Sequence, residues 1–157
     1  MQIATFAAGC FWGVEAAFLK VEGVLDTKVG YTGGHLQEPT YKQVCNGDTG
    51  HAEAIEIKFD ESKVSYKELL NIFFWTHDPT QLNRQGPDIG SQYRSAIFYH
   101  GEEQKKEAGE VMDEVSASED IKGKIVTELT EASKFWPAEE YHQRYFEKQG
   151  IDNVCHN

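Results

Sequence analysis

Hydrophobic and polar residues recur along this chain with two different periods, which separate predicted strands from predicted helices. In the segment 52–59, Ile55, Ile57 and Phe59 alternate with charged residues, which predicts a strand with one apolar face. Residues 65–75 instead repeat apolar side chains every three or four positions, which predicts a helix. The same patterns predict strands over 2–7, 25–31, 93–100 and 125–129, helices over 11–21 and 102–116, and a short last helix opened by Pro137 that carries Tyr141 and Tyr145.

Two long stretches show neither period. Residues 32–51 and 76–92 are rich in Gly, Tyr, Asp and His, and loops of this length are uncommon in a compact domain unless they carry function. The predicted helix at 65–75 begins with a capping box formed by Ser65 and Glu68. We expect an α+β fold, a two-layer α/β sandwich with helices packed on a mixed sheet, a ferredoxin-like core, long loops and an irregular C-terminal tail.

Composition and charge narrow the class of protein. The length of 157 residues suits a single domain over 1–157, in which we expect 150–157 to be a flexible tail. No apolar run is long enough to span a bilayer and no signal peptide is visible, so we expect a cytoplasmic protein or a mature form without a targeting segment, and no membrane partner. The net charge of −11 disfavours nucleic acid as a partner. No apolar stripe demands a second subunit, so we expect a monomer.

The segment Gly9-Cys10-Phe11-Trp12-Gly13 contains the strongest candidate for chemistry. It lies between a predicted strand and a predicted helix, so the free N–H groups of the first helical turn should favour a Cys10 thiolate, which is the nucleophilic form of cysteine. Phe11 and Trp12 can wall an apolar pocket beside the sulfur. The alternative is a buried structural cysteine, which the flanking glycines and aromatic pair make less attractive.

Glu53 falls on the apolar face of the predicted strand at 52–59. Burial of a carboxylate there raises its pKa, and a carboxyl group that stays protonated near neutral pH can act as a general acid. The alternative is that Glu53 turns to solvent at the end of the strand or caps a neighbouring N–H. For the neighbouring His51, a hydrogen-bonded packing role is favoured over catalysis.

A nucleophilic thiol, a protonated carboxyl group and an aromatic pocket together suggest oxygen transfer onto the cysteine sulfur. Cys10, Cys45 and Cys155 form neither a C-x-x-C pair nor a zinc-binding pattern, and no metal, nucleotide or phosphate site is predicted. A thiolate that accepts oxygen becomes a sulfenic acid, and a second thiol must then condense with it. Cys155, on the predicted tail, is one candidate for that second thiol, and Cys45 is the other, although we favour a packing role for Cys45.

These residues lie in segments that resemble the A-type peptide methionine sulfoxide reductases, which reduce methionine-S-sulfoxide. The resemblance covers nearly the whole chain, with several separate motifs in the family's order. They are GCFWG at 9–13, GYTGG at 30–34, PTY at 39–41, TGHAE at 49–53, HDPTQ at 77–81, DIGSQYRS at 88–95 and FWPAEEYHQRY at 135–145.

The resemblance implies a role for each candidate residue. Cys10 would attack the sulfoxide sulfur, and Glu53 would protonate the departing oxygen. Tyr41 and Tyr93 would donate hydrogen bonds to the same oxygen. Further expected contacts are those of Phe11 and Trp12 with the substrate methyl group and of Asp88 with its main-chain amide.

The resemblance also implies how the enzyme is recycled. Its substrate would be methionine-S-sulfoxide in oxidised proteins or peptides, or the free amino acid, and no bound cofactor is expected. Many members end in a tail with two cysteines, but this chain has only Cys155 there. The expected cycle therefore forms a single Cys10–Cys155 disulfide, which thioredoxin or another dithiol reduces.

Two other function classes remain as alternatives. A thiol peroxidase would use the same cysteines but requires an arginine near the thiolate, and Arg94 is the residue that could approach in space. A non-catalytic module could instead bind apolar or oxidised peptides in the aromatic pocket, and its binding would survive the change Cys10→Ser.

Overall fold

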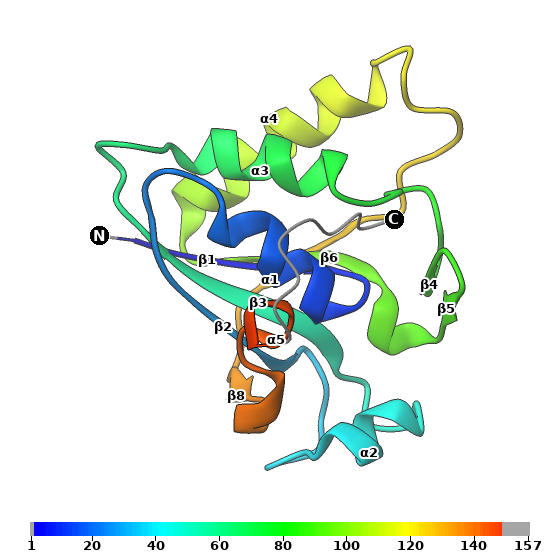
Figure 1. Cartoon of the computed structure of the whole chain (residues 1–157). Coiled ribbons are helices and arrows are strands. Elements are labelled where there is room, and N and C mark those ends of the chain that lie inside the picture. The colour runs from blue at the N-terminus through cyan, green and yellow to red at the C-terminus, as the bar shows by residue number, and fades with distance from the viewer. Residues whose placement is uncertain (1, 149–157) are drawn as a thin grey trace.

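A six-stranded mixed sheet organises the molecule, in the order β7-β6-β1-β3-β2-β8. The structure is a computed structural model that describes residues 2–148 (Figure 1). The sheet strands are β1 (Gln2–Ala8), β2 (Val24–Thr32), β3 (Ala52–Phe59), β6 (Ser95–Tyr99), β7 (Glu128–Glu131) and β8 (Trp136–Pro137). The strands β4 (Arg84–Gln85) and β5 (Asp88–Ile89) form a separate small hairpin. The helices are α1 (Phe11–Leu19), α2 (Tyr41–Cys45), α3 (Tyr66–Trp75), α4 (Glu102–Ser116) and α5 (Tyr145–Lys148), with 3-10 turns η1 (Ser91–Tyr93) and η2 (Glu140–His142).

The central part of the sheet has ferredoxin-like topology. The chain runs β1-α1-β2-β3-α3-β6, and the four strands lie side by side in the order β6-β1-β3-β2. All neighbours in this group are antiparallel, whereas β7 adds to the edge of β6 in parallel. The α+β class and the mixed sheet expected from the sequence are thereby confirmed.

The main hydrophobic core lies between one face of the sheet and the helices α1, α3 and α4, which cover it (Figure 1). The sheet contributes alternate residues such as Phe6, Ile55 and Ile57, and α3 contributes a continuous apolar face that includes Leu70 and Phe73. A smaller cluster on other sheet residues packs against the C-terminal segment. Its members are Ala7, Ala52, Ala54, Ala96 and Phe98, with Ala132 and Phe135 against them.

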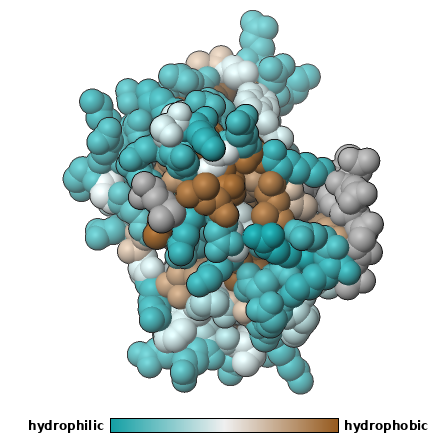
Figure 2. Space-filling model, turned by 60° about the vertical axis from the view of Figure 1, so that its left-hand side comes forward, coloured by the Kyte–Doolittle hydropathy of each residue, from teal (hydrophilic) through white to brown (hydrophobic). Residues whose placement is uncertain are grey.

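The outer surface is largely hydrophilic. Figure 2 shows one face on which polar residues surround a central hydrophobic area. Among the described residues, no helix is both long and apolar enough to cross a membrane.

Most predicted elements are present, with ends that differ by one or two residues in several of them, and three predictions need correction. The strand predicted over 93–100 spans only Ser95–Tyr99, because Tyr93 belongs to the turn η1, and the strand predicted over 125–129 is shifted to Glu128–Glu131. Pro137 does not open a helix. It lies in β8 at the sheet edge, where a residue without an N–H group is tolerated. Tyr141 and Tyr145 therefore lie in two separate short elements, η2 and α5.

The first long stretch also contains an element that the sequence patterns did not predict. Helix α2 begins after Thr40, whose side chain accepts a hydrogen bond from the Gln43 backbone N–H, while Gln43 bonds back to the Thr40 N–H. The capping box predicted at the start of α3, between Ser65 and Glu68, is confirmed.

Candidate active site

Cys10 lies at the turn between β1 and α1, as the sequence predicts, and is the N-cap residue of α1. Gly9 makes this turn possible, since its φ of +95° lies in the left-handed region that favours glycine. The backbone N–H groups of Trp12 and Gly13 both point toward the Cys10 sulfur and favour its ionised form. The thiol is partly exposed, so a substrate can reach it.

The prediction that Cys10 is ionised is nevertheless wrong. Burial raises the pKa of Cys10 to about 12, and the negative charges of Glu53 and Asp88 act in the same direction. The two backbone N–H groups of α1 oppose this shift but are too weak to reverse it. Cys10 is therefore a thiol at neutral pH and must lose its proton as it reacts.

Glu53 lies on β3 with its side chain inside the molecule, 1% exposed, on the same face as Ile55 and Ile57. Its Oε1 accepts a hydrogen bond of 3.3 Å from the Phe11 backbone N–H, at the start of α1. Its Oε2 is buried and accepts or donates no hydrogen bond among residues 2–148. Burial raises the pKa of Glu53 to about 8 against the effect of the Phe11 N–H, so the predicted upward shift is confirmed. At pH 7 the carboxyl group is mostly protonated and available as an acid.

Aromatic side chains surround this pair. The Phe11 ring is buried, with its centroid 5.8 Å from that of Tyr31 and 6.3 Å from that of Tyr41. Trp12 lies further out, and its ring stacks on Tyr145 at 3.8 Å with an angle of 9° between the planes. The predicted proximity of Phe11 and Trp12 to the sulfur follows from their places in the first turn of α1.

The two long loops and the turn η1 bring three further predicted residues to the site. Tyr41 begins α2, Tyr93 ends η1, and Asp88 lies in β5 of the second loop. Burial first, and then the charge of Glu53, raises the pKa of both tyrosines, so both hydroxyl groups remain hydrogen-bond donors. Asp88 lies close enough for its charge to raise the pKa of Cys10 and Glu53.

The C-terminal segment supplies side chains that position the site and that the sequence reasoning did not single out. Glu139 accepts hydrogen bonds from the Tyr31 hydroxyl at 2.8 Å and from the Tyr41 backbone N–H at 3.0 Å, so it ties β2 to α2. His142 is fully buried, and its Nδ1 accepts the Trp12 indole N–H at 2.9 Å. Both residues belong to the segment 135–145 that carries part of the family resemblance, but the sequence pattern does not show what their side chains contact.

The remaining candidates fall in three different places. His51 is buried and holds the first loop, through hydrogen bonds with the Gly34 N–H and the Leu36 carbonyl, which confirms its packing role. A packing role for Cys45 is wrong: its side chain is exposed at the end of α2 and bonds the Tyr41 hydroxyl. Cys155 lies outside the described residues. Within residues 2–148 no three His, Cys, Asp or Glu side chains are grouped so that they could hold a metal ion.

Comparison with known proteins agrees with this arrangement. Residues 2–157 match the family model described as peptide methionine sulfoxide reductase. The chain is 60% identical over 148 residues to the peptide methionine sulfoxide reductase MsrA of Methanococcoides burtonii, which covers 94% of this chain and 97% of that protein.

Solved structures extend the likeness to the fold. The structure of reduced Mxr1 from Saccharomyces cerevisiae superposes with a TM-score of 0.90 at 37% identity, covering 98% of this chain and 88% of Mxr1. A structure of Mxr1 in complex with Trx2 gives a TM-score of 0.65 at 25% identity, covering 92% of this chain and 84% of that one. Together with the family model that matches nearly every residue, these relatives show that the chain belongs to the peptide methionine sulfoxide reductase family and is of the MsrA type.

Proposed function

We propose that this oxidoreductase reduces methionine-S-sulfoxide through a Cys10 sulfenic acid. The Cys10 sulfur attacks the sulfoxide sulfur while Glu53 transfers its proton to the sulfoxide oxygen. The S–O bond of the substrate then breaks, the oxygen passes to Cys10 as a sulfenic acid, and methionine leaves with its sulfur reduced by two electrons. The thiol proton of Cys10 restores the Glu53 carboxylic acid, so protons balance.

A single observation carries this proposal: no residue in 2–148 bonds the buried Oε2 of Glu53, which lies close to the Cys10 thiol and to aromatic side chains. A buried polar atom without a partner is costly, so such an atom at a functional site is well placed to bond a ligand. A sulfoxide oxygen fits, because it accepts the proton that Glu53 retains near neutral pH. The Tyr93 hydroxyl can donate to the same oxygen and stabilise its developing charge, and so can the Tyr41 hydroxyl once it turns from the Cys45 sulfur.

The rest of the pocket supports recognition of methionine. Trp12 is partly exposed and offers most of the apolar surface for the methyl group, whereas the Phe11 ring is 1% exposed. This surface favours the epimer whose oxygen points instead toward Glu53. Asp88 is partly exposed at the rim and can accept a hydrogen bond from a peptide N–H group. We therefore place peptide-bound methionine-S-sulfoxide first among the substrates.

Recycling would require a second thiol. We propose that the Cys155 thiol condenses with the sulfenic acid, releasing water and forming a Cys10–Cys155 disulfide. Thioredoxin would then reduce this disulfide and become oxidised itself. The complex of the related Mxr1 with Trx2 supports such a partner.

The test is a reaction of the reduced protein with a peptide containing both sulfoxide epimers, without added reductant. We expect loss of the S epimer in one equivalent and a Cys10–Cys155 bond by peptide mass mapping, and Cys155→Ser should leave a trappable sulfenic acid on Cys10. A bond between Cys10 and Cys45 would refute the role of Cys155. No loss of either epimer, even with dithiothreitol, would overturn the proposed reaction.

The thiol peroxidase alternative receives no support from Arg94. Its guanidinium bonds the Glu128 carboxylate and the Ser91 carbonyl, both at 3.0 Å. The groups that act most on the Cys10 pKa are carboxylates and backbone N–H groups, and Arg94 is not among them.

A further inference from the structure

Besides Glu53 on β3, the molecule buries the side chain of Glu15 on α1, and the reaction proposed above does not use Glu15. It is 1% exposed and lies one helical turn beyond Phe11 and Trp12. Its Oε2 accepts a hydrogen bond of 2.8 Å from the Thr27 hydroxyl of β2. Its Oε1 accepts the backbone N–H of Arg144 at 2.5 Å, 129 residues away in sequence. A buried carboxylate is expensive to keep, so these two bonds require an explanation.

The backbone at Arg144 is strained. Its φ is +51°, in the left-handed region that non-glycine side chains rarely adopt, and such a conformation persists only where surrounding contacts hold it. The Glu15 carboxylate bonds the N–H of this same residue. The salt bridge of 3.4 Å between the Arg144 guanidinium and Asp26 is half exposed, so it contributes little.

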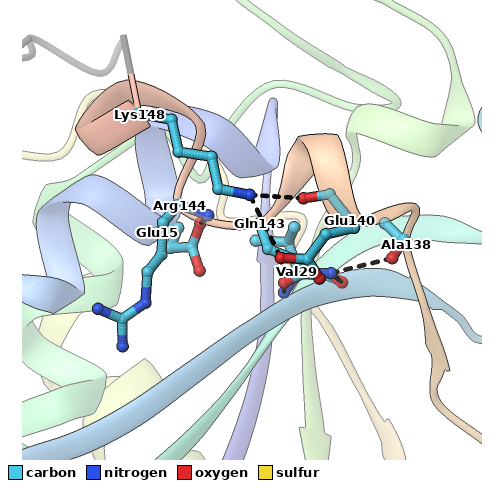
Figure 3. A network of polar contacts seen from close by, with 7 residues as sticks. All are labelled: Glu15, Val29, Ala138, Glu140, Gln143, Arg144 and Lys148. Carbon is cyan, nitrogen blue, oxygen red and sulfur yellow. Dashed lines mark hydrogen bonds and ion pairs between the residues drawn. The ribbon is translucent and has the colours of Figure 1, made fainter. Parts of the chain in front are cut away.

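The segment that follows is only partly buried. No residue of α5 is fully buried, and a cavity of about 160 Å³ lies between α1 and this segment, lined by residues that include Trp12, Glu15 and Phe146. Besides the ring contacts with Trp12, polar contacts hold the segment (Figure 3). The Gln143 side chain bonds both the N–H and the carbonyl of Val29, each at 2.9 Å.

Two residues that flank Gln143 and Arg144 in the sequence contact Trp12. His142 accepts the indole N–H, and Tyr145 stacks on the indole ring. Arg144 lies between them in sequence, so its backbone conformation affects where both side chains lie. Glu15 and Trp12 both belong to α1, and both contact the segment 142–145: Glu15 bonds Arg144, and Trp12 contacts His142 and Tyr145.

We propose that Glu15 is a positioning residue for the substrate pocket: its carboxylate holds the Arg144 turn against α1 and so keeps His142 and Tyr145 on the Trp12 ring. This inference rests on the proposed function, since Trp12 forms the wall for the substrate methyl group. It assigns Glu15 no contact with substrate and no proton transfer.

The test compares Glu15→Leu, Glu15→Gln and Thr27→Val in the full chain. Leucine has a similar size but cannot accept the Arg144 N–H, whereas glutamine can accept it and donate to the Thr27 oxygen. Thr27→Val removes the other hydrogen bond of the same carboxylate and leaves the Arg144 turn in place. The readouts are the Trp12 indole N–H resonance, assigned with Trp12→Phe, its hydrogen-exchange rate, and KM and kcat for a methionine-S-sulfoxide peptide.

For Glu15→Leu we expect a shifted, faster-exchanging indole resonance and a KM raised about tenfold with kcat changed far less, the pattern of lost binding. Glu15→Gln and Thr27→Val should keep the resonance and KM of the parent protein. An unchanged indole signal in Glu15→Leu, or the same change in Thr27→Val, would overturn the inference. The indole readout needs no substrate, so it decides the role of Glu15 even if the proposed reaction fails.

Discussion

At the scale of single residues, burial changes the acidity of two groups in the same direction with different consequences. It raises the pKa of Glu53 to about 8 and that of Cys10 to about 12. The carboxyl group thereby keeps the proton that an acid catalyst must give. The thiol keeps a proton that it must lose in the proposed reaction, and the Glu53 carboxylate that remains after protonation of the substrate can accept that proton.

The first prediction concerns the proton on Glu53. Activity should fall as pH rises through about 8, because only the protonated carboxyl group can donate. Glu53→Gln keeps a hydrogen-bond donor but has no acidic proton, so we expect single-turnover reduction to slow by roughly 10²–10³-fold and to lose this pH dependence. The measurement is rapid-quench loss of the S epimer between pH 6 and 9. Glu56→Gln, on the other face of β3, is the matched control and should behave as the parent protein.

The second prediction concerns the two tyrosine hydroxyl groups. Each proposed hydrogen bond to the sulfoxide oxygen is worth about 1–2 kcal/mol in the transition state, so Tyr41→Phe and Tyr93→Phe should each slow the single turnover by roughly 5–30-fold. The double variant should lose considerably more than either, because the oxygen then keeps only Glu53. Tyr99→Phe, on β6, serves as a control. Unchanged single-turnover rates in both single variants would remove the tyrosines from the mechanism.

Sequence reasoning reached the residues whose environment is set locally. Cys10 follows from its place between a strand and a helix, and Glu53 follows from the alternation of β3. It missed Glu139, His142 and Glu15, whose side chains accept hydrogen bonds from groups about 100 or more residues away in sequence. It also gave Cys10 the wrong ionisation, because the depth of burial cannot be read from a local motif.

At the scale of elements, the helices and strands with a regular hydrophobic period could be predicted, whereas the short strand at the edge of the sheet could not. Helices α3 and α4 and strand β3 each bury one face, so the spacing of their hydrophobic residues predicts the type of element. The short strand β8 pairs only Gly30 with Pro137 and Tyr31 with Trp136, which is too little for a periodic signal. Its position comes from tertiary contacts with β2.

The third prediction tests this edge through Gly30. A Cβ atom added there would collide with the Trp136 carbonyl oxygen and the Phe135 ring, so Gly30→Ala should push β8 away from β2 and lower the free energy of unfolding by about 2 kcal/mol. Urea denaturation measures this. The control is Gly109→Ala in α4, where a Cβ meets nothing within 4 Å and should instead stabilise the protein by roughly 0.5–1 kcal/mol. Equal stability of Gly30→Ala and the parent would show that β8 does not approach β2 this closely.

At the scale of the whole molecule, the net charge of −11 and the buried carboxyl groups act on stability in different ways. The surface charges repel one another weakly through solvent, and added salt screens them. The buried carboxyl groups of Glu53 and Glu15 instead couple folding to protons, since burial raises the pKa of both. Salt should therefore affect the first contribution much more than the second.

The fourth prediction follows from this coupling. The folded protein holds the Glu53 proton up to pH about 8, whereas the unfolded chain releases it near the ordinary value of 4.5. Stability from this group is therefore complete below pH 4.5 and is lost as pH rises toward 8, by about 1.4 kcal/mol per pH unit at most. The glutamine of Glu53→Gln cannot ionise. The free energy of unfolding of this variant, minus that of the parent, should therefore increase at each step from pH 5 to 8. Urea denaturation of the reduced proteins at pH 5, 6, 7 and 8 gives this difference, and other titrating groups cancel between the two proteins. A difference that stays constant across this range would mean that Glu53 is ionised in the folded protein, and the proton for the sulfoxide oxygen would have to come from another group.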